Sequence, residues 1–110
     1  MNFKIAYTPN FEREAKRLAK KYPSLKNDLS ILVEELKEKP ATGTLVFKNV
    51  YKVRLAISAK GKGKGKSGGA CVMTYVQINK ESITLFSIFS KGEKDTITDK
   101  EIILLLQEIE

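Results

Sequence analysis

The sequence predicts an α+β fold, in which an N-terminal helical hairpin and a C-terminal helix pack against a small antiparallel sheet. Apolar residues recur at helical spacing in two segments before residue 40 and in one after residue 97. Between residues 51 and 89 they instead follow the spacing of strands. The length of 110 residues favours one domain, residues 1–110.

The first third of the chain has the pattern of a strand followed by two helices. Residues 3–7 alternate as in a short strand, and Thr8 and Pro9 then resemble a helix start with Thr8 as the N-cap. One helical face is formed by Phe11, Ala15, Leu18, Ala19 and Tyr22. A second helix, ending before Pro40, is indicated by Leu25, Leu29, Leu32, Val33 and Leu36. The charged residues of both helices are expected to be ordinary solvated surface.

From residue 51 the apolar residues recur at every second position, as in a β-strand. One face of the predicted strand holds Tyr51, Val53, Leu55 and Ile57, and the other holds Lys52, Arg54 and Ala56. A glycine–lysine segment over residues 59–69 follows, and then strands over residues 70–78 and 83–89. Thr98 and Glu101 have the spacing of a capping box. The helix that they open is strongly apolar and is expected to be core or a docking face: Ile102, Ile103, Leu105, Leu106, Ile109.

The composition excludes several kinds of chemistry. The chain has no histidine, which removes Ser-His and Cys-His nucleophile pairs and Cys/His zinc fingers. The lone Cys71 cannot form an internal disulfide, so nothing indicates an oxidising compartment. The longest uncharged run, residues 67–79, is too short to cross a bilayer, and the N-terminus lacks a secretory pattern. We therefore expect a soluble, cytoplasmic protein without membrane contact.

The basic charge is concentrated in the middle of the chain. Residues 39–80 contain nine Lys or Arg residues and no acid, while the chain as a whole has 20 basic and 13 acidic residues. Such a segment suits a polyanionic partner, nucleic acid first and anionic lipid second. The alternative is a solubilising stripe without a partner.

Within that segment, four lysines alternate with glycines: Lys60, Lys62, Lys64 and Lys66. Glycines let the backbone approach an RNA strand and donate N–H groups to phosphate, while the lysines supply charge. A functionally silent hairpin tip is the alternative. Gly65-Lys66-Ser67 looks like the end of a phosphate-binding P-loop, but Lys60 stands where that motif needs glycine and a strand pattern follows.

Other residues have a functional and a structural interpretation side by side. Four aromatic residues can stack on bases or pack in the core, and for one of them, Phe86, core is expected: Tyr51, Tyr75, Phe86, Phe89. Cys71 is expected to be a small buried apolar residue, with a reactive thiol as the alternative.

Two stretches together resemble a known family: VYKVRLAISAKGKGKGKSGGACVMTYV and ITLFSIFSKGEKDTIT, within residues 50–106. The combination of the YKxR strand, the Lys/Gly loop closing in KSGGA and the strand ending SIFSKGEK resembles the RelE/ParE superfamily of bacterial toxins, in its HigB-like branch. The resemblance implies a toxin of a type II toxin–antitoxin system. Such a toxin enters the ribosomal A site and cuts mRNA, and an antitoxin, expected to carry a DNA-binding helix-turn-helix, holds it inactive.

The resemblance also implies the chemistry of a ribonuclease without histidine. In this family the ribose 2′-OH attacks the adjacent phosphate, and basic side chains with a tyrosine take the place of the histidine pair. Lys52 and Arg54 match the basic strand positions, Lys64 and Lys66 lie in the basic loop, and Lys91 matches the basic residue after the last strand. Neither a metal nor an organic cofactor is expected.

Two residues depart from the family pattern. Cys71 stands where relatives usually carry arginine after the GG, and Phe89 stands where HigB-like relatives often have tyrosine. A thiol cannot clamp phosphate as a guanidinium does, and a phenyl ring can stack on a base but cannot donate a proton. We expect weakened catalysis with RNA or ribosome binding retained. Two alternatives follow, a non-catalytic ribosome- and RNA-binding translation inhibitor and a ParE-like toxin that binds gyrase.

Overall fold

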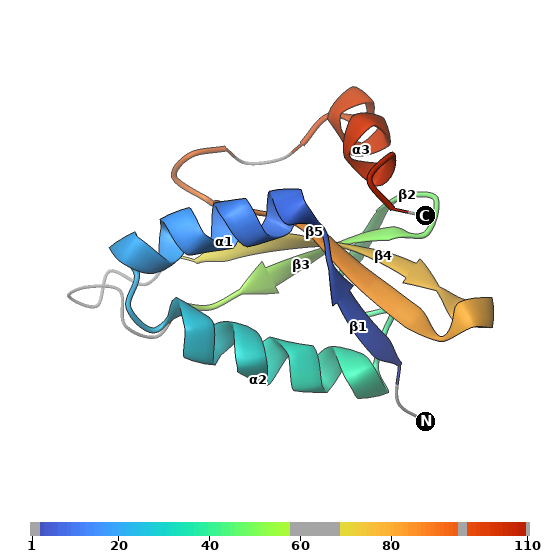
Figure 1. Ribbon diagram of the computed structural model, residues 1–110, viewed down its shortest axis with the longest axis horizontal. Coiled ribbons are helices and arrows are strands. Elements are labelled where there is room, and N and C mark those ends of the chain that lie inside the picture. Colours follow the sequence, from blue (N-terminus) through green and yellow to red (C-terminus); the bar gives the residue numbers. More distant parts are fainter. Residues whose placement is uncertain (1–2, 58–68, 95–96, 110) are drawn as a thin grey trace.

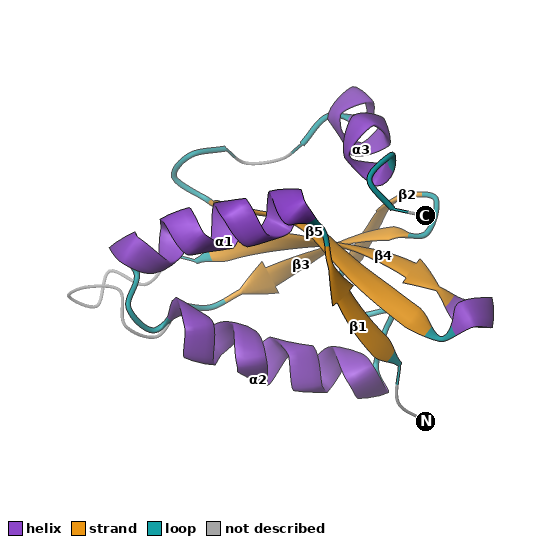
Figure 2. Cartoon of the chain, in the orientation of Figure 1, coloured by secondary structure: helices purple, strands orange, loops and turns teal. Residues whose placement is uncertain are grey.

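The computed structural model describes residues 3–57, 69–94 and 97–109. The elements, in chain order, are β1 (Lys4–Tyr7), α1 (Pro9–Lys21), α2 (Leu25–Glu38), β2 (Thr44–Phe47), β3 (Val50–Leu55), β4 (Ala70–Gln77), the 3-10 helix η3 (Ile78–Lys80), β5 (Ser82–Ser90) and α3 (Asp99–Leu106). Figure 2 shows these elements along the chain. The predicted α+β class is confirmed.

The five strands form one sheet in the order β1-β5-β4-β3-β2. The pairs β2–β3, β3–β4 and β4–β5 are antiparallel. The remaining pair, β1–β5, is parallel, so the sheet is mixed at one edge rather than wholly antiparallel as predicted. The first strand thus lies beside the last one, and the helical hairpin carries the chain between β1 and the antiparallel strands.

Strand β2 was not foreseen from the sequence. It has only four residues, of which Leu45 is 59% exposed and Val46 and Phe47 are half-buried, so its pattern does not alternate cleanly. It is held by pairing with β3 across a tight turn in which Asn49 has a positive φ of 63°. Asparagine tolerates this left-handed conformation better than most residues.

The predicted helix starts are confirmed. The Thr8 hydroxyl accepts a hydrogen bond from the Phe11 backbone N–H at 3.1 Å, with Pro9 in the first turn of α1. At α3 both halves of the capping box form: the Thr98 hydroxyl accepts from the Glu101 N–H at 3.1 Å, and the Glu101 carboxylate accepts from the Thr98 N–H at 3.0 Å. Helix α3 ends at Leu106, before the last apolar residue of the predicted run.

The sheet has an apolar core on each face. On one face, strand residues pack under α1 and α2; this hairpin-side core includes Leu18, Leu36, Val53, Leu55, Val72 and Leu85. On the other face, the α3-side core contains Val50, Cys71, Met73, Phe86, Phe89, Ile97 and Ile102. In Figure 1, α1 runs above α2 on the left of the view, and α3 lies at the upper right. Ile102 is the buried residue of α3, whereas Ile103 and Leu104 are exposed, so the helix is core on one face only.

A β-bulge in β5 changes which residues face each core. Met73 pairs with Ser87 and Thr74 pairs with Leu85, which leaves Phe86 as the extra residue. The Phe86 carbonyl accepts hydrogen bonds from α1, at 3.1 Å from the Asn10 side-chain amide and at 3.4 Å from the Thr8 hydroxyl. The bulge therefore depends on α1, and it places both Phe86 and Phe89 in the α3-side core.

Candidate nucleic-acid interface

Strand β3 separates its basic side chains from the hairpin-side core. Val53 and Leu55 are buried in that core, and because successive side chains of a strand alternate, Lys52 and Arg54 belong to the opposite face. Arg54 is exposed and Lys52 is half-buried. Two cations two residues apart on one face of a strand can both reach a single phosphodiester chain.

The strand register brings three of the predicted site residues into one row. Arg54 of β3 lies directly opposite Cys71 of β4, and Cys71 lies directly opposite Phe89 of β5. In the next row, Lys52 lies opposite Met73. Directly opposite residues of antiparallel strands carry their side chains on the same face, about 4.5–5.5 Å apart at Cβ. Arg54, Cys71 and Phe89 are therefore neighbours, although 35 residues separate the first from the last.

Cys71 and Phe89 are both buried, with exposed fractions of 3% and 2%. Cys71 is thus the small buried apolar residue that was expected. The Phe89 ring is covered from the α3 side, and the Lys94 ammonium lies 5.4 Å from its centroid, a cation–π contact. Of the two interpretations of Phe89, its burial supports packing in the core rather than stacking on a base.

The other aromatic residues also lack a fully exposed ring on which a base could stack. Phe86 is fully buried, as expected. Tyr51 is half-buried against the hairpin-side core, and Tyr75 is half-buried against the α3-side core. Base stacking is therefore a weaker part of this surface than its charge.

Lys91 lies in the turn that follows β5, close to the end of β4. Its backbone N–H donates to the Gly69 carbonyl at 3.2 Å. Gly69 has a φ of +111°, and a Cβ there would lie 3.0 Å from the Leu55 carbonyl oxygen, so only glycine fits without strain. Lys91, Arg54 and the chain at residue 69 consequently share one end of the sheet.

The four lysines of the glycine–lysine segment, Lys60, Lys62, Lys64 and Lys66, lie outside the described residues, as does the Gly65-Lys66-Ser67 sequence. The described residues that flank the segment are Ile57 and Gly69. Leu55 and Ala70, at the adjoining strand ends, are paired with each other. The described strand ends on either side of these residues therefore lie at the end of the sheet where Arg54 lies.

Ion pairs fix the turn that carries Lys91. The Arg17 guanidinium of α1 lies 2.8 Å from the Glu93 carboxylate, and the Ser90 backbone N–H donates to the same carboxylate at 3.5 Å. The hydrogen bond from Arg17 is the main reason that the pKa of Glu93 is lowered, and Glu93 in turn raises the pKa of Arg17. Next along the chain, Lys94 pairs with Glu101 of α3 at 3.5 Å. The Arg17–Glu93 pair could not be foreseen from local spacing, because 76 residues separate its partners.

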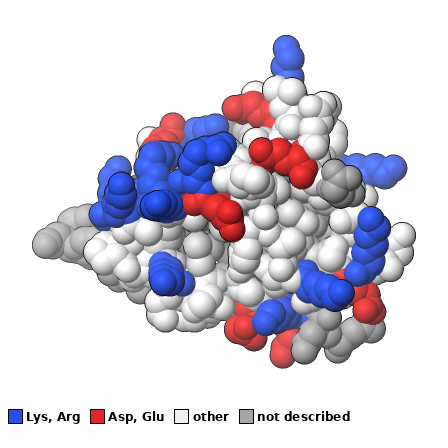
Figure 3. Space-filling view, viewed as in Figure 1, with Lys and Arg blue, Asp and Glu red and all other residues white. Residues whose placement is uncertain are grey.

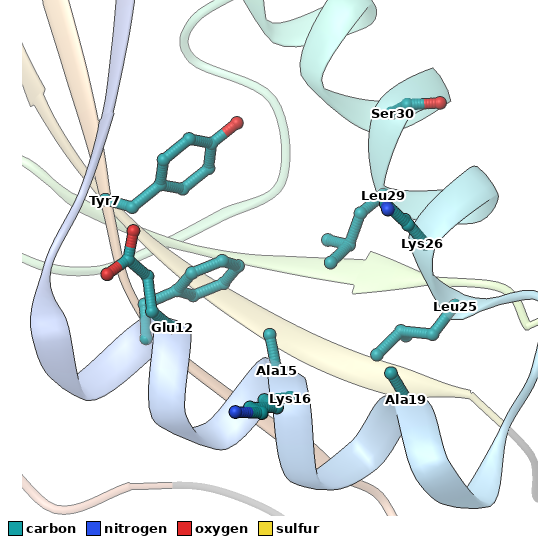
Figure 4. A pocket seen from close by; sticks show the side chains of 10 residues that line it. Tyr7, Glu12, Ala15, Lys16, Ala19, Leu25, Lys26, Leu29 and Ser30 are labelled. Atoms are coloured by element: carbon teal, nitrogen blue, oxygen red, sulfur yellow. The ribbon is translucent and has the colours of Figure 1, made fainter.

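A groove of about 550 Å³ lies on the other side of the molecule, between α1 and α2 and beside Tyr7. Figure 4 shows its apolar lining, which includes Ala15, Leu25 and Leu29, with the charged side chains Glu12, Lys16 and Lys26 at its border. It contains none of the predicted site residues. Among the residues that the structure describes, no cluster of acids and Cys71 could hold a metal ion, and no helix is both long and apolar enough to span a bilayer.

Comparison with known proteins relates the chain to others by fold. No protein-family model matches the sequence, and no curated protein is similar to it in sequence. Among solved structures, the chain is similar to a free double arginine-to-alanine mutant of the E. coli toxin RelE, with a TM-score of 0.59 and 15% sequence identity. The match covers 98% of this chain and 94% of that one. The chain therefore has a RelE-like fold along almost its whole length.

Proposed function

We propose that this protein is the toxin of a type II toxin–antitoxin system, of the HigB-like branch, and that it cuts mRNA on the ribosome. The observation that most supports this proposal is that Lys52 and Arg54 share one face of β3, with Arg54 exposed, on a fold similar to that of RelE. Its partners would be the ribosome, mRNA and a helix-turn-helix antitoxin, and its compartment the cytoplasm.

The proposed reaction needs no cofactor. The ribose 2′-hydroxyl gives up its proton to solvent or a basic side chain, and its oxygen forms a bond to the adjacent phosphorus. The bond from phosphorus to the 5′-oxygen of the next nucleotide breaks, and that oxygen takes up a proton, which leaves a 2′,3′-cyclic phosphate and a 5′-hydroxyl. The pentacovalent phosphorane between these states carries more negative charge than the starting diester, so cations fixed beside it lower the barrier. Lys52 and Arg54 would provide this charge from β3, and Lys91 would add to it from the end of the sheet. The resemblance to the toxin family implies a further contribution from Lys64 and Lys66.

A second candidate function is inhibition of translation without cleavage. The row Arg54–Cys71–Phe89 favours it, because the two buried members offer neither a second guanidinium nor a phenol next to Arg54. A protein with this surface would still bind RNA through charge, and would block the ribosome by occupying it.

The test is cleavage of an end-labelled mRNA on programmed ribosomes. We expect the unaltered protein to cut the message. Lys52→Gln/Arg54→Gln should lose at least about 100-fold in cleavage rate, by analogy with the loss of about 10²–10³ when one preorganised donor is removed from a developing oxyanion. The matched control is Lys39→Gln/Lys80→Gln, which removes the same net charge from exposed positions outside this surface. It should cut like the unaltered protein.

The same samples separate the alternatives. Inhibited protein synthesis with an intact message would support the non-catalytic function. Inhibition of DNA supercoiling by gyrase, with translation unaffected, would instead support a ParE-like toxin. Equal cleavage by both double variants would contradict the assignment of Lys52 and Arg54.

A further inference from the structure

Helix α1 carries a row of basic side chains on its exposed side, separate from the surface on β3. The row, here called the α1 stripe, consists of Arg13, Lys16, Arg17, Lys20 and Lys21, all exposed. At about 100° per residue these positions fall within an arc of about 140°, opposite the buried Phe11 and Leu18. In Figure 3 the basic side chains gather over α1 at the upper left. These charges were expected to be ordinary solvated surface, although their spacing in the sequence places them on one helical face.

The stability of the helix does not account for the α1 stripe. Members three or four residues apart, such as Lys16 and Lys20, repel each other on the helix surface. Lys20 and Lys21 complement the negative end of the helix dipole, but Arg13 and Lys16 lie too far toward the N-terminus to do so. In the described part of the chain, Arg17 is the one stripe residue with an acidic partner, Glu93.

The α1 stripe is connected to the turn that carries Lys91. Arg17 holds Glu93 at 2.8 Å, and Glu93 lies two residues after Lys91. The stripe therefore borders the end of β5, where the candidate interface of Arg54 and Lys91 also lies.

We propose that the α1 stripe binds the phosphate backbone of double-stranded RNA, and so acts as a second anchor on the ribosome. That this RNA belongs to the ribosome rests on the proposed function, whereas the binding of double-stranded RNA by the stripe does not. The stripe is straight, about 12 Å long and uninterrupted by apolar residues from Arg13 to Lys21, which suits a rigid array of phosphates. Protein–protein interfaces have apolar centres and few lysines, whereas three of these five residues are lysine. Phosphate contacts of this kind position a protein without selecting a sequence.

The test compares the affinities of two double variants of equal charge for a short blunt-ended RNA duplex. Fluorescence anisotropy measures each affinity at several salt concentrations. Lys16→Gln/Lys20→Gln alters the stripe, and Lys39→Gln/Lys80→Gln is the control at the end of α2 and in η3. Glutamine keeps the helix propensity of lysine, so α1 should remain folded. We expect the stripe variant to lose on the order of tenfold or more in affinity, and its log–log salt slope to be shallower by about 1.8, about 0.9 for each lost contact. The control should match the unaltered protein.

Three results would overturn the proposal. One is an equal loss of duplex affinity in both double variants, which would mean that only net charge matters. Another is a salt-independent affinity, or no duplex binding, in the unaltered protein. The third is unchanged duplex affinity in the stripe variant together with lost binding to polyglutamate, which would assign the stripe to an acidic protein. Cleavage of messenger RNA on ribosomes is measured in parallel. If cleavage is absent, the proposed function is contradicted, but binding of the RNA duplex still decides whether the stripe binds RNA.

Discussion

Glu14 holds the irregular part of β5, and its removal is expected to destabilise the fold. Its Oε1 accepts hydrogen bonds from the Ser87 hydroxyl at 2.9 Å and from the Ile88 backbone N–H at 3.1 Å. Ser87 and Ile88 are both buried, so Glu14→Ala leaves their two donors without this acceptor. Each such loss costs about 1–3 kcal/mol.

The expected loss in the free energy of unfolding is therefore about 3 kcal/mol, after a few tenths are regained from the better helix propensity of alanine. That is a large share of the about 5–15 kcal/mol by which a small domain is stable. Urea unfolding measures the change as a lower midpoint at an unchanged m value.

Two variants test whether the loss comes from these hydrogen bonds. Glu14→Gln keeps an oxygen acceptor at the same place and should recover part of the stability. Glu12→Ala removes an exposed carboxylate from the same helix and should change stability by no more than about 0.5 kcal/mol. If Glu14→Ala unfolds at the same urea concentration as Glu12→Ala, the bulge does not depend on Glu14.

Three further outcomes are expected in unfolding measurements. Gly69→Ala should lower the free energy of unfolding by about 1–2 kcal/mol, because Gly69 has a positive φ and the Leu55 carbonyl is close. Gly92→Ala should not, because nothing lies within 4 Å of a Cβ there. Equal losses in the two variants would contradict the strain at Gly69. The pKa of Glu93 is lowered in the folded protein, so its pairing with Arg17 stabilises the fold fully at pH values above the ordinary pKa of 4.5. This stabilisation is lost as the pH falls through the lower pKa of the folded state. The stability difference between the unaltered protein and Glu93→Gln should therefore shrink below pH 4.5, and a constant difference would contradict the pairing. Thr98→Ala should cost about 1 kcal/mol through loss of the cap, and an unchanged midpoint would show that α3 does not need it.

Features set by neighbouring residues could be predicted from the sequence. The caps at Thr8 and Thr98 depend on residues three positions away, so their spacing is visible in the chain itself. The same holds for the assignment of Val53 and Leu55 to the core and of Arg54 to the other face, which follows from alternation.

Features set by distant partners could not be predicted. Local spacing does not reveal that β1 pairs in parallel with β5, or that β2 is stabilised by its edge pairing. The bulge at Phe86 is formed by backbone groups that α1 satisfies, and it decides that Phe89 is buried on the α3 side. The neighbourhood of Arg54, Cys71 and Phe89 follows from register, which a single sequence leaves open.

The central claim is that Lys52 and Arg54 contact a ribonucleotide backbone together. It is tested most directly by the salt dependence of affinity for a single-stranded RNA, because each phosphate contact contributes about −0.7 to the log–log slope. We predict that Lys52→Gln/Arg54→Gln makes this slope shallower by about 1.4, while Lys39→Gln/Lys80→Gln leaves it unchanged. Identical slopes for the two double variants would contradict the claim.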